Sequence, residues 1–390
     1  MPTTTLSRDE ARAYLVSQLG LARPRRERGG RGVRAMLDAL RCVQLDPLDP
    51  MGTNADLVAL ARIDGIAKGD LYAHTLPGHA FEHFAKERCL LPARAFPHYR
   101  DQAAETPWWR LGDRLRRLPD GVLDAVREEI AARGPITAGE LEDRGRVEPI
   151  DWSGWKGTGR AASMAIEVLW TRCEIVVAGR TTRAKLWDVP RRALPDQHDV
   201  DVAGHGFAAW ALRERVEAAG LLSRAGGATW SMLRDARTDG TIEQLIDEGA
   251  IEEVAVEGAR RTYLAPRGFQ ERRVIAPDDR MRILGPLDPV LWDRDLVRHA
   301  FGFDYVWEVY KPAEERRFGW YVVPLLHRGR FVGRLEGRVD GTTLVIERLW
   351  REEGVALDED ALDAALERHA IACGCDRVVR RPGARRRAKR

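Results

Sequence analysis

The order of helices and strands in the middle of the chain constrains the fold more than any other feature, because it occurs twice. Between residues 120 and 195 the sequence predicts three helices and then two strands joined by a Gly-Arg turn. The helices are expected over 121–134, 138–145 and 159–174, and the strands over 175–179 and 180–190. This is the order of a winged helix, in which the third helix and the strand pair are placed to meet a DNA duplex.

A similar order returns about 80 residues further along the chain. Helices are expected over 207–220 and 241–254, and strands over 254–258 and 260–266. Arg260 and Arg261 lie on the wing of this later winged-helix segment. The two winged-helix segments form a weak internal repeat.

The two ends of the chain have different patterns. Ser7, with Glu10 three residues later, predicts a capping box and a helix that ends near Gly20. A second helix is expected from Val33 to about Cys42. Near the other end, four apolar runs bounded by Gly and Asp-Gly turns predict a small antiparallel sheet or barrel, followed by a helix over 358–373. These runs are 307–312, 318–326, 330–339 and 343–350.

These patterns predict an α+β fold of tandem winged helices with a C-terminal antiparallel β-rich, barrel-like domain. The first domain is expected to be an N-terminal helical or winged-helix region that carries the sequence Gln-Leu-Asp. The second and third domains are winged helices, and the fourth holds the sheet, the closing helix and a basic tail. The expected domains are 1–117, 118–197, 198–275 and 276–390.

Composition argues against a membrane or secreted protein. Apolar residues make up 44% of the 390 residues, but no apolar run approaches the roughly 18 residues of a membrane span. The N-terminus, MPTTTLSRDE, lacks the basic head and apolar middle of a secretory signal. The five cysteines show no metal-binding spacing, which is typical of a reduced, cytoplasmic protein. We therefore expect a cytoplasmic protein without a metal or cofactor.

Positive charge is concentrated in two places, although the net charge is only +3. Residues 21–41 hold seven arginines against Glu27 and Asp38, and the run RRPGARRRAKR at 380–390 holds seven basic residues and no acid. Clustered arginine is typical of proteins that bind polyanions such as nucleic acid. A solvated basic surface without a partner is the alternative.

The stretch VQLDPLDP at 43–50 places an amide and a carboxylate two residues apart. If the chain is extended here, Gln44 and Asp46 project to one side and Leu45 points the other way, into the core. Such a pair can hold a water, and the carboxylate can stabilise a positively charged, sugar-like transition state. The alternative is that the two Asp-Pro pairs only start turns.

Three further segments are weaker candidates. The sequence from His79 to His83 matches the H-x-x-E-H zinc pattern, which needs both histidines on one helix face, but its apolar residues also suit a packing helix. The Trp-rich, basic segment 152–160 could stack bases or pack between domains. The hairpin 325–331 has a basic tip that suits either a DNA groove or a solvated turn.

Four stretches of the chain resemble the bacterial winged-helix DNA glycosylases of the AlkZ/YcaQ type, which remove bulky alkylated bases and unhook interstrand crosslinks. They are VQLD at 43–46, FEHFAKERCLLP at 81–92, RTTRAKLWDVPRRALP at 180–195, and the block 284–326. The last block is the most specific. The family signature, Gln-apolar-Gln or Gln-apolar-Asp, falls on Gln44, Leu45 and Asp46, and the Asp form resembles the YcaQ branch. Pro47 and Pro50 depart from the family pattern.

The resemblance implies that Gln44 and Asp46 are catalytic. It implies a monofunctional glycosylase of base excision repair that hydrolyses the N-glycosidic bond of N7-alkylated guanine, including bulky adducts and interstrand crosslinks. The expected partner is double-stranded DNA with alkylated or crosslinked bases, met by a monomer at the bacterial nucleoid. A non-catalytic winged-helix transcriptional regulator is the competing hypothesis.

The predicted wing and the basic C-terminal hairpin also indicate which residues contact DNA. They are Arg180, Arg183 and Lys185 on the wing of the first winged helix, and Arg330 at the tip of the C-terminal hairpin.

Overall fold

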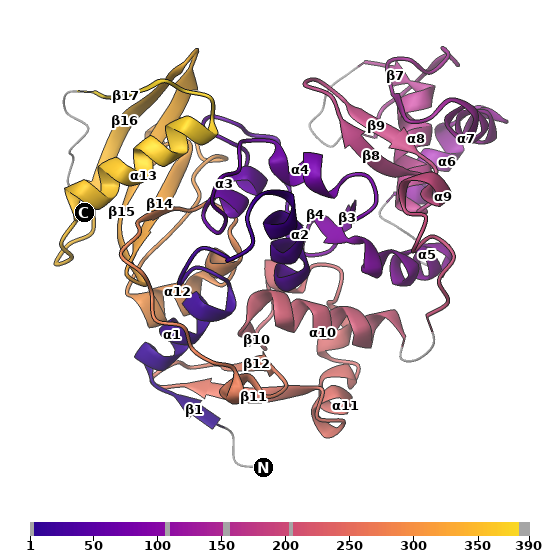
Figure 1. Cartoon of the computed structure of the whole chain (residues 1–390). Helices are drawn as coiled ribbons and strands as arrows, with labels where there is room; N and C mark the ends of the chain where they lie inside the picture. Colours follow the sequence, from indigo (N-terminus) through magenta and orange to yellow (C-terminus); the bar gives the residue numbers. More distant parts are fainter. Residues whose placement is uncertain (1–3, 106–109, 151–156, 203–205, 382–390) are drawn as a thin grey trace. The chain divides into compact units, whose positions relative to one another are not determined.

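The computed structural model describes residues 4–105, 110–150, 157–202 and 206–381 (Figure 1). The chain divides into two compact units, each of which is described by itself. The first unit comprises 1–71, 85–89 and 208–390, and the second comprises 72–84 and 90–207. In the described ranges, no helix has the length and apolar character needed to cross a membrane. The elements confirm the expected α+β class.

The first unit contains a four-stranded sheet with the order β1-β11-β12-β10. Its strands are β1 (Thr4–Leu6), β10 (Leu222–Ser223), β11 (Ile251–Val256) and β12 (Thr262–Pro266). Along the chain, helix α10 (Phe207–Ala219) precedes β10, and helix α11 (Thr241–Asp247) lies between β10 and β11. The expected helix over 241–254 is wrong in its second half, because Gly249 adopts φ 63° and the chain then enters β11 with Ile251 and Val254 buried.

A second sheet of this unit has the order β13-β14-β15-β16-β17. Its strands are β13 (Arg282–Ile283), β14 (Val322–His327), β15 (Arg330–Asp340), β16 (Thr343–Arg351) and β17 (Arg377–Arg380). The predicted antiparallel order is confirmed from β13 to β16, but β17 pairs with β16 in parallel and 307–312 forms no strand. Helix α13 (Glu359–Ala372) lies along this sheet and buries Leu362 and Leu366 against Leu335 and Ile346 (Figure 1).

The remaining helices of the first unit include the segment that carries the Gln-Leu-Asp stretch. They are α1 (Arg8–Gln18), α2 (Gly29–Leu40), α3 (Asn54–Leu60) and α12 (Arg294–Phe301). The capping box of Ser7 and Glu10 is confirmed, since each side chain bonds the backbone N–H of the other. Helix α2 begins four residues before the expected Val33. After α3 the chain forms α4 (Asp70–Thr75), β3 (Ala80–Phe84) and β4 (Arg88–Pro92).

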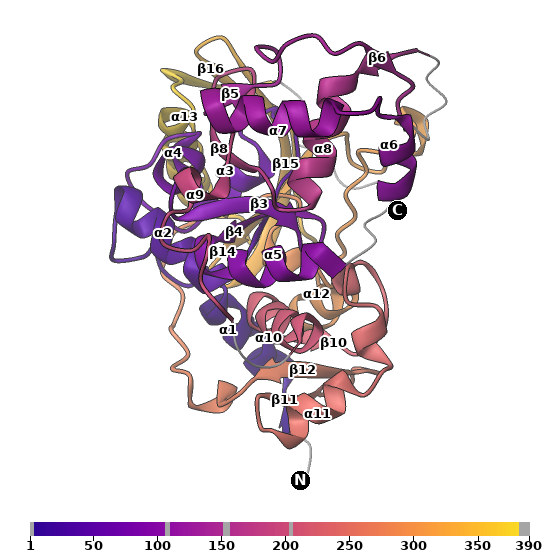
Figure 2. The same cartoon turned by 90° about the vertical axis from the view of Figure 1, so that its right-hand side faces the viewer.

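The second unit pairs helices with a small antiparallel sheet of order β5-β9-β8 (Figure 2). Its helices are α5 (Phe96–Glu105), α6 (Leu111–Arg117), α7 (Val122–Arg133), α8 (Ala161–Thr171) and α9 (Pro190–Ala193). Its strands are β5 (Ile136–Thr137), β8 (Val176–Arg180), β9 (Lys185–Asp188) and the pair β6 (Arg146–Val147) and β7 (Gly159–Arg160). Eight of the eleven residues of α8 are buried, so packing explains its strong apolar pattern.

The helix expected over 138–145 is wrong, because this segment forms a turn and an irregular stretch. The guanidinium of Arg160 donates to the carbonyl oxygens of Ala138 at 2.8 Å and Leu141 at 2.6 Å. The carboxylate of Glu140 accepts from the backbone N–H and hydroxyl of Thr137. Side chains therefore satisfy backbone groups that a helix would otherwise pair internally.

Candidate active site

Gln44 and Asp46 lie where the chain leaves α2 and becomes extended. Arg41 ends the helix with φ 64°, and β2 (Val43–Gln44) follows. The Leu45 N–H donates to the carbonyl of Arg88 at 2.8 Å, which keeps this segment beside the start of β4. Gln44 is buried, whereas Leu45 and Asp46 are half-buried, so Leu45 is less enclosed than a core residue.

Asn54, the first residue of α3, fixes the backbone of Gln44. Its Nδ2 donates to the Gln44 carbonyl at 2.8 Å, and its Oδ1 accepts from the Leu287 N–H at 2.9 Å. Asn54 is fully buried, and a Cβ atom on Gly285 would come within 2.4 Å of its Oδ1. The segment 284–288 must therefore carry glycine at this position for Asn54 to hold Gln44.

Asp46 both forms a turn and keeps a free oxygen. Its Oδ1 accepts from the Leu48 N–H at 3.0 Å, which confirms that Asp46 starts a turn. Within the described ranges, Oδ2 has no hydrogen-bond or ion-pair partner. Burial raises the pKa of Asp46 above its ordinary value, although the bond from Leu48 opposes the rise. The turn-forming and chemical interpretations of this aspartate are thus compatible.

Lys86 joins this pair and was not recognised from the sequence. Its Nζ donates to Gln44 Oε1 at 2.9 Å, and its side chain lies 5.3 Å from the ring centroid of Trp292. Only 6% of Lys86 is exposed, and burial lowers the pKa of its amine. The one available signal was its place in the stretch 81–92, which contributes to the family resemblance.

Aromatic side chains lie near Asp46. The Tyr321 hydroxyl and the Trp307 indole Nε1 are buried, and neither has a hydrogen-bond partner among the residues described. Burial raises the pKa of Tyr321, and the charge of Asp46 is the next cause of that rise. Tyr321 meets the Trp307 ring edge-on at 6.2 Å and belongs to a core cluster with Met51, near which Leu48 also packs. Of these groups, Tyr321 is close enough to Asp46 for the charge of Asp46 to affect its pKa.

The four predicted DNA-contact residues differ in their surroundings. Arg180 and Lys185 both bind the fully buried carboxylate of Glu82, Lys185 at 2.5 Å, and Arg180 also lies 4.2 Å from the Tyr72 ring centroid. Arg183 lies exposed between β8 and β9, and its guanidinium forms no ion pair with the described residues. These three belong to the second unit.

Arg330 belongs to the first unit and begins β15 directly after a two-residue turn. The turn residues Arg328 and Gly329 both have positive φ, as a tight hairpin requires. Arg330 is exposed, whereas Arg328 donates to Asp279 at 2.7 Å. The basic hairpin tip is thus formed as the sequence predicted.

The zinc-like pattern at 79–83 is not on a helix. Residues Ala80–Phe84 form β3, so His79 and His83 are not one helical turn apart, and that hypothesis is wrong. His83 is buried instead, with its ring 5.0 Å from that of Tyr99 and 5.1 Å from that of Trp170. Four of the five residues of β3 are buried, as in a packed strand. Of the Trp-rich segment, residues 151–156 lie outside the described ranges.

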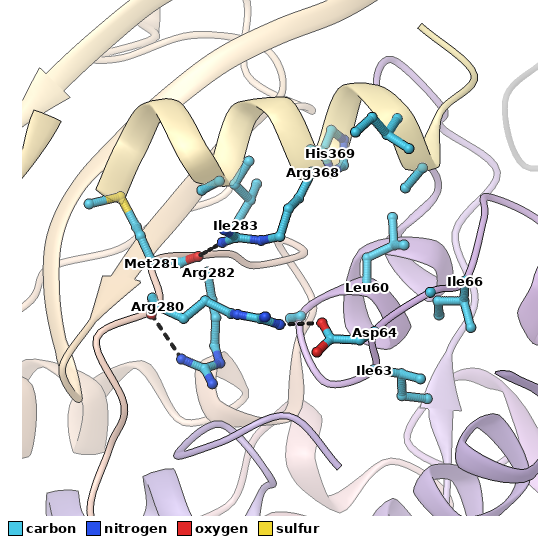
Figure 3. Close-up of a pocket in the computed structure, with 15 residues that line it drawn as sticks. Leu60, Ile63, Asp64, Ile66, Arg280, Met281, Arg282, Ile283, Arg368 and His369 are labelled. Carbon is cyan, nitrogen blue, oxygen red and sulfur yellow. Dashed lines mark hydrogen bonds and ion pairs between the residues drawn. The ribbon is translucent and has the colours of Figure 1, made fainter. Parts of the chain in front are cut away.

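A separate pocket of about 190 Å³ lies between α13 and the segment 60–66 (Figure 3). Its arginines already have protein partners: Arg280 binds Asp64, and Arg368 donates to the Met281 carbonyl at 2.9 Å. His369, which also lines it, lies 2.7 Å by Nε2 from the Met51 carbonyl. This pocket includes neither Gln44 nor Asp46, and its walls support the loop that follows them.

A half-buried carboxylate beside a fixed carboxamide has the groups that a hydrolase of glycosidic bonds needs. The whole fold is similar to that of the Streptomyces sahachiroi DNA glycosylase AlkZ, with a TM-score of 0.60 over 97% of this chain and 100% of that one, at 18% identity. The family model of AlkZ-like DNA glycosylases matches residues 37–371. The chain belongs to this family, and the AlkZ/YcaQ-type resemblance is confirmed. It is therefore a DNA glycosylase that acts on DNA in repair, and a non-catalytic regulator is not supported.

Proposed function

We propose that this glycosylase hydrolyses the N-glycosidic bond of N7-alkylated guanine in duplex DNA, including bulky adducts and interstrand crosslinks, without lyase activity. The observation that carries this proposal is that Oδ2 of half-buried Asp46 has no hydrogen-bond partner among the described residues, two positions after the anchored Gln44. The membership of the AlkZ-like family supports the reaction type.

The chemistry requires little from an acid catalyst. Alkylation at N7 places a positive charge on guanine, so the base accepts the electron pair of the breaking C1′–N9 bond and leaves as a neutral molecule. Positive charge then develops on the sugar, where the Asp46 carboxylate stabilises it. Asp46 also orients the attacking water, whose oxygen bonds C1′ while its proton passes to the carboxylate or solvent. Gln44 adds a polar contact at this centre.

We also propose that two parts of the chain are winged helices within the domain division 1–117, 118–197, 198–275 and 276–390. In the second unit, α7, β5, α8, β8 and β9 occur in that order, without the helix expected over 138–145, and β9 lies between β5 and β8. In the first unit, α10, β10, α11, β11 and β12 follow the same order, with β12 between β10 and β11. The shared strand order supports the internal repeat.

A base-release experiment tests the proposed reaction. Duplexes that carry N7-methylguanine, a bulky N7 adduct or a nitrogen-mustard crosslink are incubated with excess protein, and freed base and abasic sites are quantified separately from strand breaks. We expect abasic sites from all three lesions and no enzyme-dependent strand cleavage before alkaline treatment. Release from none of the lesions would contradict the proposed substrate, and cleavage without alkali would contradict the monofunctional assignment.

We further propose that Arg183 and Arg330 contact DNA phosphates, because both are exposed and neither forms an ion pair with the residues that the structure describes. Arg180 and Lys185 are retained as proposed contacts, but each must share its charge with Glu82.

The Arg183→Ala substitution is expected to weaken binding to every DNA sequence alike and to reduce the slope of log K against log salt by about one. Fluorescence anisotropy over a range of salt concentrations measures both quantities. Arg191→Ala, at an exposed arginine of α9 in the same unit, is the matched control for loss of charge. An equal change of slope in the two variants would show a general charge effect and exclude a specific contact at Arg183.

A further inference from the structure

We infer that Lys86 is a positioning residue that turns the side-chain amide of Gln44 so that its NH2 group, and not its oxygen, faces the substrate. This inference rests on the proposed glycosylase function, and it specifies what Gln44 contributes to that reaction.

The chemistry of the contact fixes the amide orientation. An ammonium group has three donors and no acceptor, so the Gln44 atom 2.9 Å from Lys86 Nζ must be the oxygen. This argument settles an orientation that is otherwise ambiguous between the O and N of an amide. Asn54 holds the backbone carbonyl of Gln44 at the same time. Both ends of the residue are therefore fixed before any substrate arrives.

The NH2 group of Gln44 remains available. Within the ranges that the structure describes, Gln44 Nε2 donates no hydrogen bond, while Oε1 and the backbone carbonyl each accept one. Nε2 is not among the buried side-chain atoms that lack a partner, so it retains contact with solvent. A side chain that is only 8% exposed thus keeps two donors for a ligand.

No ion pair among the described residues explains the charge of Lys86. It forms no ion pair with a carboxylate in the described part of the chain, and the nearest aromatic surface is the Trp292 ring. Burial lowers the pKa of the amine, as expected where the charged form is desolvated. An apolar side chain of similar length would fill this place at lower cost, since burying an unpaired charge is unfavourable. The contact with Gln44 is what the amine supplies.

The orientation assigns different tasks to the two members of the pair. Asp46 is the acceptor, which suits the oxocarbenium charge and the proton of the attacking water. Gln44 is the donor, and its target is an acceptor atom of the lesion nucleotide. When the C1′–N9 bond breaks, its electron pair passes to the base and raises the electron density on base acceptors such as N3 and O6. A hydrogen bond from Gln44 to such an atom strengthens in the transition state, as a catalytic contact must.

The Gln44→Glu substitution tests the donor role directly. Glutamate keeps an oxygen for Lys86 but has no NH2 group to offer. Single-turnover release of N7-methylguanine is expected to slow as much in Gln44→Glu as in Gln44→Ala. Full activity of Gln44→Glu would overturn the inference, because it would show that an acceptor serves the reaction equally well.

A double-mutant cycle tests whether Lys86 acts through Gln44. Lys86→Met is expected to slow base release about 10-fold in the otherwise unaltered protein, the loss associated with one hydrogen bond, with DNA affinity unchanged. In the Gln44→Ala background the same substitution should have no further effect on the rate. An equal slowing in both backgrounds would overturn the positioning role, since a merely structural effect is additive.

Controls separate this inference from the proposed function. If the unsubstituted protein releases no alkylated base, the proposed function fails. If it releases base and Gln44→Glu does so equally fast, only the present inference fails. Should Lys86→Met lower the melting temperature strongly, the comparison of Gln44→Glu with Gln44→Ala still decides the donor role, because both variants retain Lys86.

Discussion

Asp46→Asn is expected to slow the release of N7-methylguanine from duplex DNA by about 10²- to 10³-fold, the effect of removing one preorganised electrostatic contact from a transition state. The substitution preserves the shape of the side chain and an oxygen for the Leu48 N–H. It removes the negative charge that opposes the positive sugar. Single-turnover kinetics with saturating protein measure the chemical step apart from DNA binding.

Asp49→Asn is the matched control for Asp46→Asn. Asp49 lies three residues away in the same loop, but its carboxylate is occupied by the Gly52 N–H at 3.0 Å and by Lys68 at 2.6 Å. Base release by this variant should stay near that of the unsubstituted protein. Equal slowing of both variants would show that the loop, and not the Asp46 charge, limits the reaction.

The pH dependence of the base-release rate tests the role of the Asp46 carboxylate independently. Because burial raises the pKa of Asp46, the ionised form should be lost on acidification at a higher pH than the ordinary aspartate value of about 3.9. The rate should therefore fall as the pH drops through this raised pKa, and the residual rate of Asp46→Asn should lack that fall. An identical acid limb in both proteins would assign it to another group.

Arg62→Met is expected to lower the free energy of unfolding by about 3–5 kcal/mol, because it leaves a buried carboxylate without its partner. Arg62 and Asp288 are 1% and 0% exposed and form two hydrogen bonds of 2.7 and 2.9 Å. Arg62 also donates to the carbonyls of Leu19 at 2.7 Å and Val58 at 3.0 Å. Urea or thermal unfolding followed by circular dichroism measures the loss.

Arg261→Met provides the matched control for the loss of an ion pair. Arg261 and Asp295 are bonded at 2.9 Å, but their side chains are 48% and 52% exposed. Solvent screens such a pair, so the change in unfolding free energy should stay within about 1 kcal/mol. Similar values for the two variants would contradict the special contribution of the buried pair. The Arg62 pair anchors the segment 284–288, whose Leu287 also bonds Asn54, the residue that holds the backbone of Gln44 in the proposed catalytic pair.

Sequence patterns predicted correctly those features that depend on residues close together in the chain. The capping box at Ser7 and the bounds of the closing helix over 358–373 were correct, because the ends of a helix are decided largely by neighbouring residues. The helix over 138–145, the second half of the helix over 241–254 and the helical zinc pair were wrong, because the competing interactions came from elsewhere. Arg160 satisfies the carbonyls of the first segment, and burial in a sheet decides the second.

Long-range strand pairing was beyond the sequence patterns. Thr4 pairs with Val254 in parallel, and Thr343 pairs with Arg377, so each short strand is stabilised by a partner that no local period reveals. A strand of three or four residues has too few positions for alternation to be distinguished from chance.

The sequence by itself determined the spacing of Gln44 and Asp46. In an extended chain, the side chains of residues two positions apart point to the same side because of covalent geometry alone. The sequence also indicated the family, through stretches that the family model bears out. Only the tertiary structure decided which groups hold Gln44 in place. Lys86 is 42 residues from Gln44, and Leu287 is 233 residues from Asn54. Folding alone brings these residues together, because a hydrogen bond depends on distance in space and not on separation along the chain.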